Sequence, residues 1–111
     1  MVDISVTGHN QITLMEVSGR IDSFNANELG DALTGEIDGG NIQIVLDLGN
    51  VEFMSSAGLR ELVNSLKRTK RAGGDLRLAQ PSDRVREVLE MSGLDTVLRI
   101  YASHTDAINS Y

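Results

Sequence analysis

The sequence predicts a single α/β domain spanning residues 1–111, in which a mixed, mostly parallel β-sheet packs against about four helices. Two observations support this fold class. Short apolar runs rich in β-branched residues alternate along the chain with amphipathic stretches of helical period. The composition, 41% hydrophobic and 23% charged, is that of a globular protein with a real core. Strands alternating with helices imply parallel pairing through right-handed crossovers.

The chain opens with a predicted β-hairpin. Ile4 and Val6 indicate a short first strand, and residues 12–17 read as a second strand. His9-Asn10 is expected to form the turn between them. Ser18-Gly19 is expected to interrupt the second strand.

An amphipathic helix is predicted next. Its apolar stripe consists of Phe24, Leu29, Leu33 and Ile37. Ser23 or Asn25 can cap its start, and Asn25 with Glu28 has the spacing of a capping box. Gly39-Gly40 is expected to end the helix.

Residues 42–48 form the clearest predicted strand, because they are almost all apolar, as in a central strand covered on both faces. Gly49-Asn50 is expected to break it. A second helix over 57–71 follows, with an apolar stripe of Leu59, Leu62, Val63 and Leu66. Its basic end, Lys67 to Arg71, complements the negative end of the helix dipole, an explanation preferred here over a binding patch. Gly73-Gly74 closes this helix.

The last third adds two strands and two helices. Leu76 and Leu78 mark a short strand, and Pro81 stands where a helix is expected to begin. The apolar stripe of that helix consists of Val85, Val88 and Leu89, and Ser92-Gly93 ends it. Residues 97–100 suggest a final strand. Ser103 and Asp106 have capping-box spacing for a closing helix, which gives the order β-β-α-β-α-β-α-β-α.

Charge and composition exclude several classes of partner and of chemistry. The formal net charge of -6 disfavours nucleic acid and anionic membranes as partners. The absence of cysteine excludes disulfides and thiolate chemistry. The sequence shows neither a secretory leader nor a bilayer-length apolar run, so a cytoplasmic protein without membrane insertion is expected.

One segment, residues 46–62, carries the most functional information. A buried strand leads through a loop into Ser55-Ser56 at the start of a helix. Either serine can cap that helix, and the helix N-terminus would tolerate a phosphate. Gly58 keeps the first turn slim, so a partner surface could approach. The simplest interpretation is a helix cap and nothing more.

The same segment resembles the STAS family, in which a hydrophobic strand precedes a Phe-Met-Asp-Ser-Ser-Gly-Leu type loop. Other stretches resemble the family in the same order along nearly the whole chain. They are Gly19-Arg20-Ile21-Asp22, Gly73-Gly74-Asp75-Leu76 and Leu89-Glu90-Met91-Ser92-Gly93-Leu94. Several matches in order make the resemblance specific to this family.

The resemblance implies a protein-binding switch of the anti-sigma-factor-antagonist type. Alignment on the loop places the family's phosphorylated serine at Ser56. Ser55 replaces the family's Asp, and Ala57 replaces its second Ser. Asp22 matches an Asp that contacts the partner kinase, although it could simply cap the following helix. The implied partner-binding residues are Asp22, Ser55, Ser56, Ala57, Gly58 and Leu59.

The implied partners are an anti-sigma factor that is also a serine kinase, and a phosphatase that resets the switch. ATP and Mg²⁺ would be held by the kinase, so no cofactor is expected on this chain. Two alternatives remain within the family: a subunit docking on a membrane transporter ATPase, and a scaffold component of a stress-sensing complex.

An enzyme is the least favoured reading. Only His9 and His104 could serve as a base, and both are expected to be ordinary surface histidines. No nucleophile elbow, phosphate loop or dinucleotide motif occurs. Asp47 lies in a predicted strand and is interpreted as a satisfied polar group. Two histidines are too few to predict a metal site.

Overall fold

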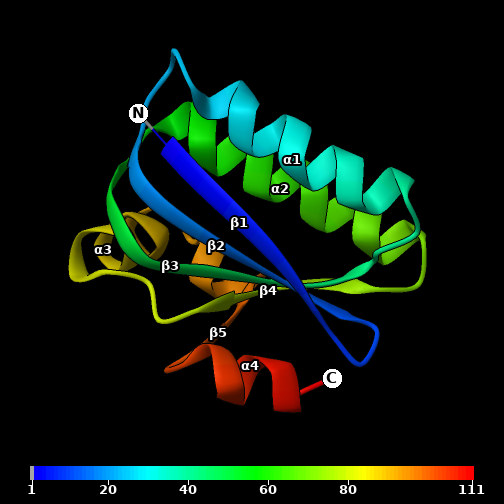
Figure 1. Ribbon diagram of the computed structural model, residues 1–111. Helices are drawn as coiled ribbons and strands as arrows, with labels where there is room; N and C mark the ends of the chain where they lie inside the picture. Colours follow the sequence, from blue (N-terminus) through cyan, green and yellow to red (C-terminus); the bar gives the residue numbers. More distant parts are fainter. Residues whose placement is uncertain (1) are drawn as a thin grey trace.

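The computed structural model describes residues 2–111 and contains one five-stranded sheet of order β1-β2-β3-β4-β5 (Figure 1). The strands are β1 (Val2–His9), β2 (Ile12–Ile21), β3 (Gln43–Met54), β4 (Asp75–Ala79) and β5 (Arg99–Tyr101). β1 pairs antiparallel with β2, and the other neighbours pair in parallel. The predicted hairpin, mixed sheet and element order are therefore confirmed.

Helices lie on both sides of the sheet. α1 (Ala26–Asp38) and α2 (Ser56–Arg71) run side by side over one face, while α4 (His104–Asn109) covers the other (Figure 1). α3 (Asp83–Met91) lies near the end of the sheet, and the 3₁₀ helix η1 (Leu94–Thr96) leads into β5. This two-sided cover leaves β3 buried on both faces, as its apolar sequence predicted.

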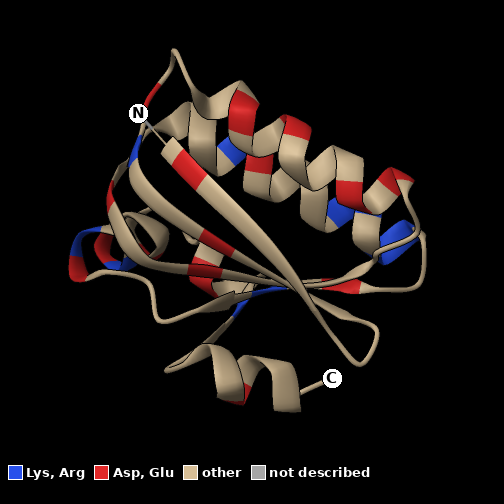
Figure 2. Cartoon of the chain, in the orientation of Figure 1, with Lys and Arg blue, Asp and Glu red and all other residues tan. Residues whose placement is uncertain are grey.

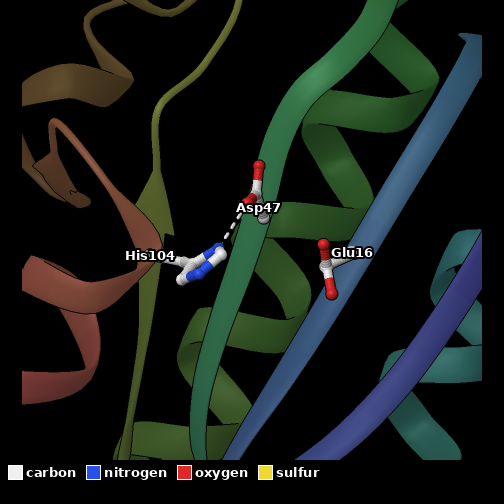
Figure 3. Close-up of side chains that lie close together, drawn as sticks. All are labelled: Glu16, Asp47 and His104. Atoms are coloured by element: carbon white, nitrogen blue, oxygen red, sulfur yellow. Dashed lines mark hydrogen bonds and ion pairs between the residues drawn. The ribbon is translucent and has the colours of Figure 1, made fainter.

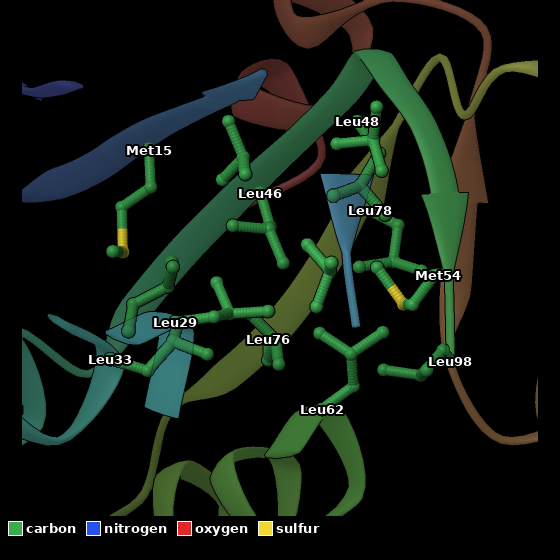
Figure 4. Close-up of a cluster of buried hydrophobic side chains, with 14 of the residues drawn as sticks. Met15, Leu29, Leu33, Leu46, Leu48, Met54, Leu62, Leu76, Leu78 and Leu98 are labelled. Atoms are coloured by element: carbon green, nitrogen blue, oxygen red, sulfur yellow. The ribbon is translucent and has the colours of Figure 1, made fainter. Parts of the chain in front are cut away.

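The main core lies between the sheet and the pair α1–α2 (Figure 4). Fully buried members of this core include Leu29, Leu33, Leu46, Leu62 and Leu76. A smaller cluster lies under α4 and consists of Ile12, Leu14, Val45, Ala79 and Ala107. Alternate residues of β3 thus supply the two cores, because successive side chains of a strand point to opposite faces.

β2 and β3 both run further than the sequence predicted. β2 continues through Ser18-Gly19, and β3 continues through Gly49-Asn50. The pairing of these strands shifts register twice along this stretch, so bulges absorb the glycine-containing segments without ending the ladder. The prediction of two breaks was wrong, and the extensions carry both strands to the same end of the sheet.

The start of α1 also differs from the prediction. Phe24 lies outside the helix and is 91% exposed, so it is not part of the apolar stripe. Asn25 is the N-cap residue, but its side chain makes no capping bond. It accepts instead from the Asp22 N–H at 2.8 Å and donates to the Arg20 carbonyl at 2.8 Å. The predicted capping box is absent because this amide closes the preceding loop.

Other helix ends follow local sequence rules. Ser103 caps α4 by accepting from the Asp106 N–H at 3.1 Å, as predicted. At α3 the cap is Ser82, which accepts from the Val85 N–H at 3.4 Å. Pro81 therefore precedes the cap and is not the first helical residue. Pro81 still restricts the backbone just before the helix, because its ring fixes the φ angle at that point.

Tyr111 anchors the end of the chain beneath the sheet and makes the stability sensitive to alkaline pH. Its hydroxyl lies 2.7 Å from the carbonyl oxygens of both Ile44 and Asp75. Burial, followed by the nearby Asp75 carboxylate, raises the pKa of Tyr111 well above its ordinary range. The neutral phenol therefore contributes its full stabilisation of the fold below a pH of about 10. Above this pH the contribution declines, because Tyr111 ionises in the unfolded chain before it ionises in the folded one.

We expect Tyr111→Phe to remove this alkaline component. At pH 7 the variant should lose about 0.5–1.5 kcal/mol through the missing hydrogen bond. Between pH 9 and 11 its unfolding free energy should fall less steeply than that of the wild type. Urea titrations across this range measure both slopes, and parallel slopes would contradict the prediction.

Candidate functional site

The predicted site lies where β2 and β3 end. Ile21 is the register partner of Met54, and the Ser55 N–H donates to the Ile21 carbonyl at 2.8 Å. This bond places the 22–25 loop directly beside the start of α2. The carboxyl ends of neighbouring parallel strands are where α/β folds commonly form binding sites.

Asp22 organises the 22–25 loop. One of its carboxylate oxygens, Oδ1, accepts from the Phe24 N–H at 2.9 Å and from the Asn25 N–H at 3.1 Å. The half-buried side chain thus closes the turn before α1. It does not cap that helix, as the sequence alternative proposed, because the N-cap residue is Asn25. The same turn holds the aromatic ring of Phe24 out in solvent.

The two serines at the start of α2 have different positions. Ser55 is the N-cap residue, and its Oγ accepts from the Gly58 N–H at 3.4 Å. Ser56 is the first residue of the helix and is exposed. The capping role therefore belongs to Ser55, which leaves the Ser56 hydroxyl at the surface of the helix N-terminus.

Gly58 serves the fold at this point. It is buried, and a Cβ there would lie 2.8 Å from Ile21 Cγ2 and 2.8 Å from Met54 Cγ. The sequence analysis predicted that Gly58 lets a partner surface approach the first turn of the helix. Gly58 faces the ends of β2 and β3 instead. Ala57 and Leu59 are partly exposed beside Ser56.

The basic end of α2 participates in intramolecular contacts. Arg68 donates to Asp38 at 2.5 Å and to Thr34 at 3.0 Å, which ties α2 to α1. Lys70 lies 3.9 Å from the Asp75 carboxylate. Figure 2 shows basic and acidic segments close together at one end of the helix pair. The contacts agree with the structural explanation preferred for this cluster.

His104 and Asp47 form a contact that the sequence did not predict. His104 Nδ1 lies 3.1 Å from Asp47 Oδ2, so His104 is not the ordinary surface histidine that was expected. Asp47 is a satisfied buried group, as predicted, because Oδ1 also accepts from the Gly49 N–H at 2.9 Å. The pair lies on the α4 side of the sheet, because His104 begins α4 and Asp47 alternates with Leu46 and Leu48, which point into the core under α1 and α2.

Among residues 2–111, no helix has the length and apolar character needed to cross a bilayer.

The fold is that of a small α/β domain with a mixed five-stranded sheet. The family model described as STAS domain matches residues 3–107, so the chain belongs to the STAS domain family.

Named relatives extend this finding. BtrV of Bordetella bronchiseptica, provisionally named an anti-sigma factor antagonist, is 34% identical over 86% of this chain and 82% of its own length. The anti-sigma-B factor antagonist of Staphylococcus aureus is 28% identical over 89% of this chain and 92% of its own.

A solved structure shares the fold. The anti-sigma factor antagonist SpoIIAA, in its unphosphorylated form, has a TM-score of 0.83 at 20% identity, covering 97% of this chain and 95% of its own. The same Bacillus protein has also been solved in its phosphorylated form, with a TM-score of 0.76 at 19% identity, covering 97% of this chain and 98% of its own.

Proposed function

We propose that this chain is a cytoplasmic anti-sigma factor antagonist, formed by one STAS domain, that works as a phosphorylation-controlled binding switch. Its unphosphorylated form binds an anti-sigma factor that is also a serine kinase, and so releases a sigma factor. Phosphorylation of Ser56 turns binding off, and a phosphatase restores it. The observation that carries the proposal is the exposed Ser56 at the first position of α2, beside the Asp22–Asn25 loop.

The relatives support this reading. BtrV and the Staphylococcus aureus protein are named as antagonists of anti-sigma factors, and both align with most of this chain. SpoIIAA, which shares the fold, exists in phosphorylated and unphosphorylated forms. A modifiable hydroxyl at Ser56 is what such a switch needs on this chain.

Local electrostatics explain how a phosphate at Ser56 would act. The group adds about -1.5 to -2 charges at pH 7. At a helix N-terminus this charge faces the positive end of the helix dipole, so the domain stays folded. An interface closing over the same point would have to bury a dianion, which opposes binding. ATP and Mg²⁺ are held by the kinase.

The contact surface extends from Ser56 to the loop beside it. Ala57 and Leu59 offer partly exposed apolar groups on α2, and Asp22 shapes the neighbouring loop. Phe24 projects from that loop and is 91% exposed. A large aromatic ring on a hydrogen-bonded loop is a common interface anchor, because little conformational entropy is lost when it is buried.

We expect Phe24→Ala to weaken binding of the kinase at least about tenfold. The free energy of unfolding should change little, because the ring is almost entirely exposed in the free protein. Titration calorimetry against the purified partner measures the affinity. Met91→Ala, at an exposed apolar residue of α3, is the matched control and should bind like the wild type. Equal affinity for the two variants would remove Phe24 from the interface.

Affinity purification from the native host, with identification by mass spectrometry, tests the function itself. A serine kinase of the anti-sigma type should co-purify with the chain and, given ATP and Mg²⁺, should phosphorylate Ser56. Recovery of a transporter ATPase with no phosphorylation would overturn the proposal and favour a docking subunit.

A further inference from the structure

Three potential metal ligands converge on the sheet face that α4 covers. Glu16 comes from β2, Asp47 from β3 and His104 from the start of α4, and one ligand atom of each lies within 4.8 Å of the others (Figure 3). Glu16 and Asp47 are direct register partners in the parallel ladder. The cluster is separate from the Ser56 surface, because α2 packs on the opposite face of the sheet.

The cluster brings two carboxylates together on neighbouring strands. Carboxylates placed opposite each other on neighbouring strands repel, and Asp47 is only 5% exposed, so water screens it poorly. A divalent ion between the three side chains would neutralise both carboxylates.

Hydrogen bonds hold the Asp47 carboxylate in place. Its Oδ1 accepts from the Gly49 N–H at 2.9 Å, and Gln80 Nε2 lies 3.0 Å from Oδ2 and 3.2 Å from Oδ1. Outer contacts of this kind fix a ligating carboxylate and raise metal affinity.

Solvent can reach the cluster on its Glu16 side. Glu16 is exposed and borders an open surface depression, whose polar lining includes Asp3, Ser5, Ser18 and Asn50. The His104 side chain is 40% exposed on the other side. An ion therefore has an entry path, and water has room to complete its coordination.

We propose that Glu16, Asp47 and His104 bind a divalent transition-metal ion of the Zn²⁺ class, with two carboxylate oxygens and one imidazole nitrogen as protein ligands. The imidazole favours such ions over Mg²⁺ and Ca²⁺, which prefer oxygen ligands only. Binding would join β2 and β3 to α4 and so hold the C-terminal helix on the sheet. The sequence did not suggest the site because its ligands come from three distant segments.

Titration of the chelator-treated full chain with ZnCl₂ at pH 7, followed by calorimetry, tests the site. We expect one Zn²⁺ per chain, with affinity reduced at least about tenfold in Glu16→Gln and in His104→Gln. His9→Gln removes the other histidine and is the matched control, which should bind like the wild type. Excess Mg²⁺ should not displace the ion. In Co²⁺-loaded protein, the resonances of His104 should shift and those of His9 should not.

Three results would overturn the proposal: no saturable Zn²⁺ binding, equal binding by the wild type and Glu16→Gln, or loss of binding in His9→Gln alone. Circular dichroism of each variant checks that it is folded. Glu16 is exposed, so its substitution decides the matter even if His104→Gln loosens α4.

Discussion

Ser56→Asp is expected to bind the anti-sigma kinase at least about a hundredfold more weakly than Ser56→Ala, which should bind constitutively. Burying an unpaired charge in an interface costs about 3–5 kcal/mol, and each 1.4 kcal/mol is a factor of ten. The alanine variant keeps the neutral surface and removes the phosphate acceptor. Titration of both variants against the purified kinase, with and without ATP, measures the difference.

Ser55→Ala is the control for this pair, because the adjacent serine has the structural role. Loss of its capping bond to the Gly58 N–H should lower the unfolding free energy by about 0.5–2 kcal/mol. Phosphorylation of Ser56 and the affinity of the folded protein should persist. Equal affinities for Ser56→Ala and Ser56→Asp would contradict the switch at this residue.

Leu62→Ala should be among the most destabilising single substitutions in α2. The side chain is fully buried and lies in the main core among leucines of the sheet (Figure 4). Truncation leaves a cavity that the packed sheet cannot refill, with a cost of about 2–5 kcal/mol. Urea unfolding followed by circular dichroism measures this loss.

Leu59→Ala, one turn earlier on the same helix, should behave in the opposite way. Its side chain is only partly buried beside Ser56, so the variant should lose less stability than Leu62→Ala. Its affinity for the kinase should fall, since Leu59 lies on the proposed contact surface. A stability loss equal to that of Leu62→Ala, with unchanged affinity, would place Leu59 in the core alone.

The sequence predicted the candidate site only in part. It offered Ser56 as the acceptor, because the resemblance aligns this residue with the family's acceptor, and this assignment stays a prediction. It left open which serine caps α2, a question that the 3.4 Å bond from the Gly58 N–H to Ser55 Oγ answers. It assigned Phe24 to a helix stripe, because helical spacing alone cannot show where a helix begins.

The sequence by itself determined the fold class, the element order and the cap residue of α4. These features depend on local periodicity and on side chains that bond within three residues. Only the tertiary structure decided how far β2 and β3 extend, because cross-strand pairing carries them past Ser18-Gly19 and Gly49-Asn50. It also decided which distant residues meet. Asp22 lies beside α2 through one backbone bond between neighbouring strands, and Glu16, Asp47 and His104 converge from three elements. Such contacts arise from pairing and packing over long sequence separations, which local patterns do not encode.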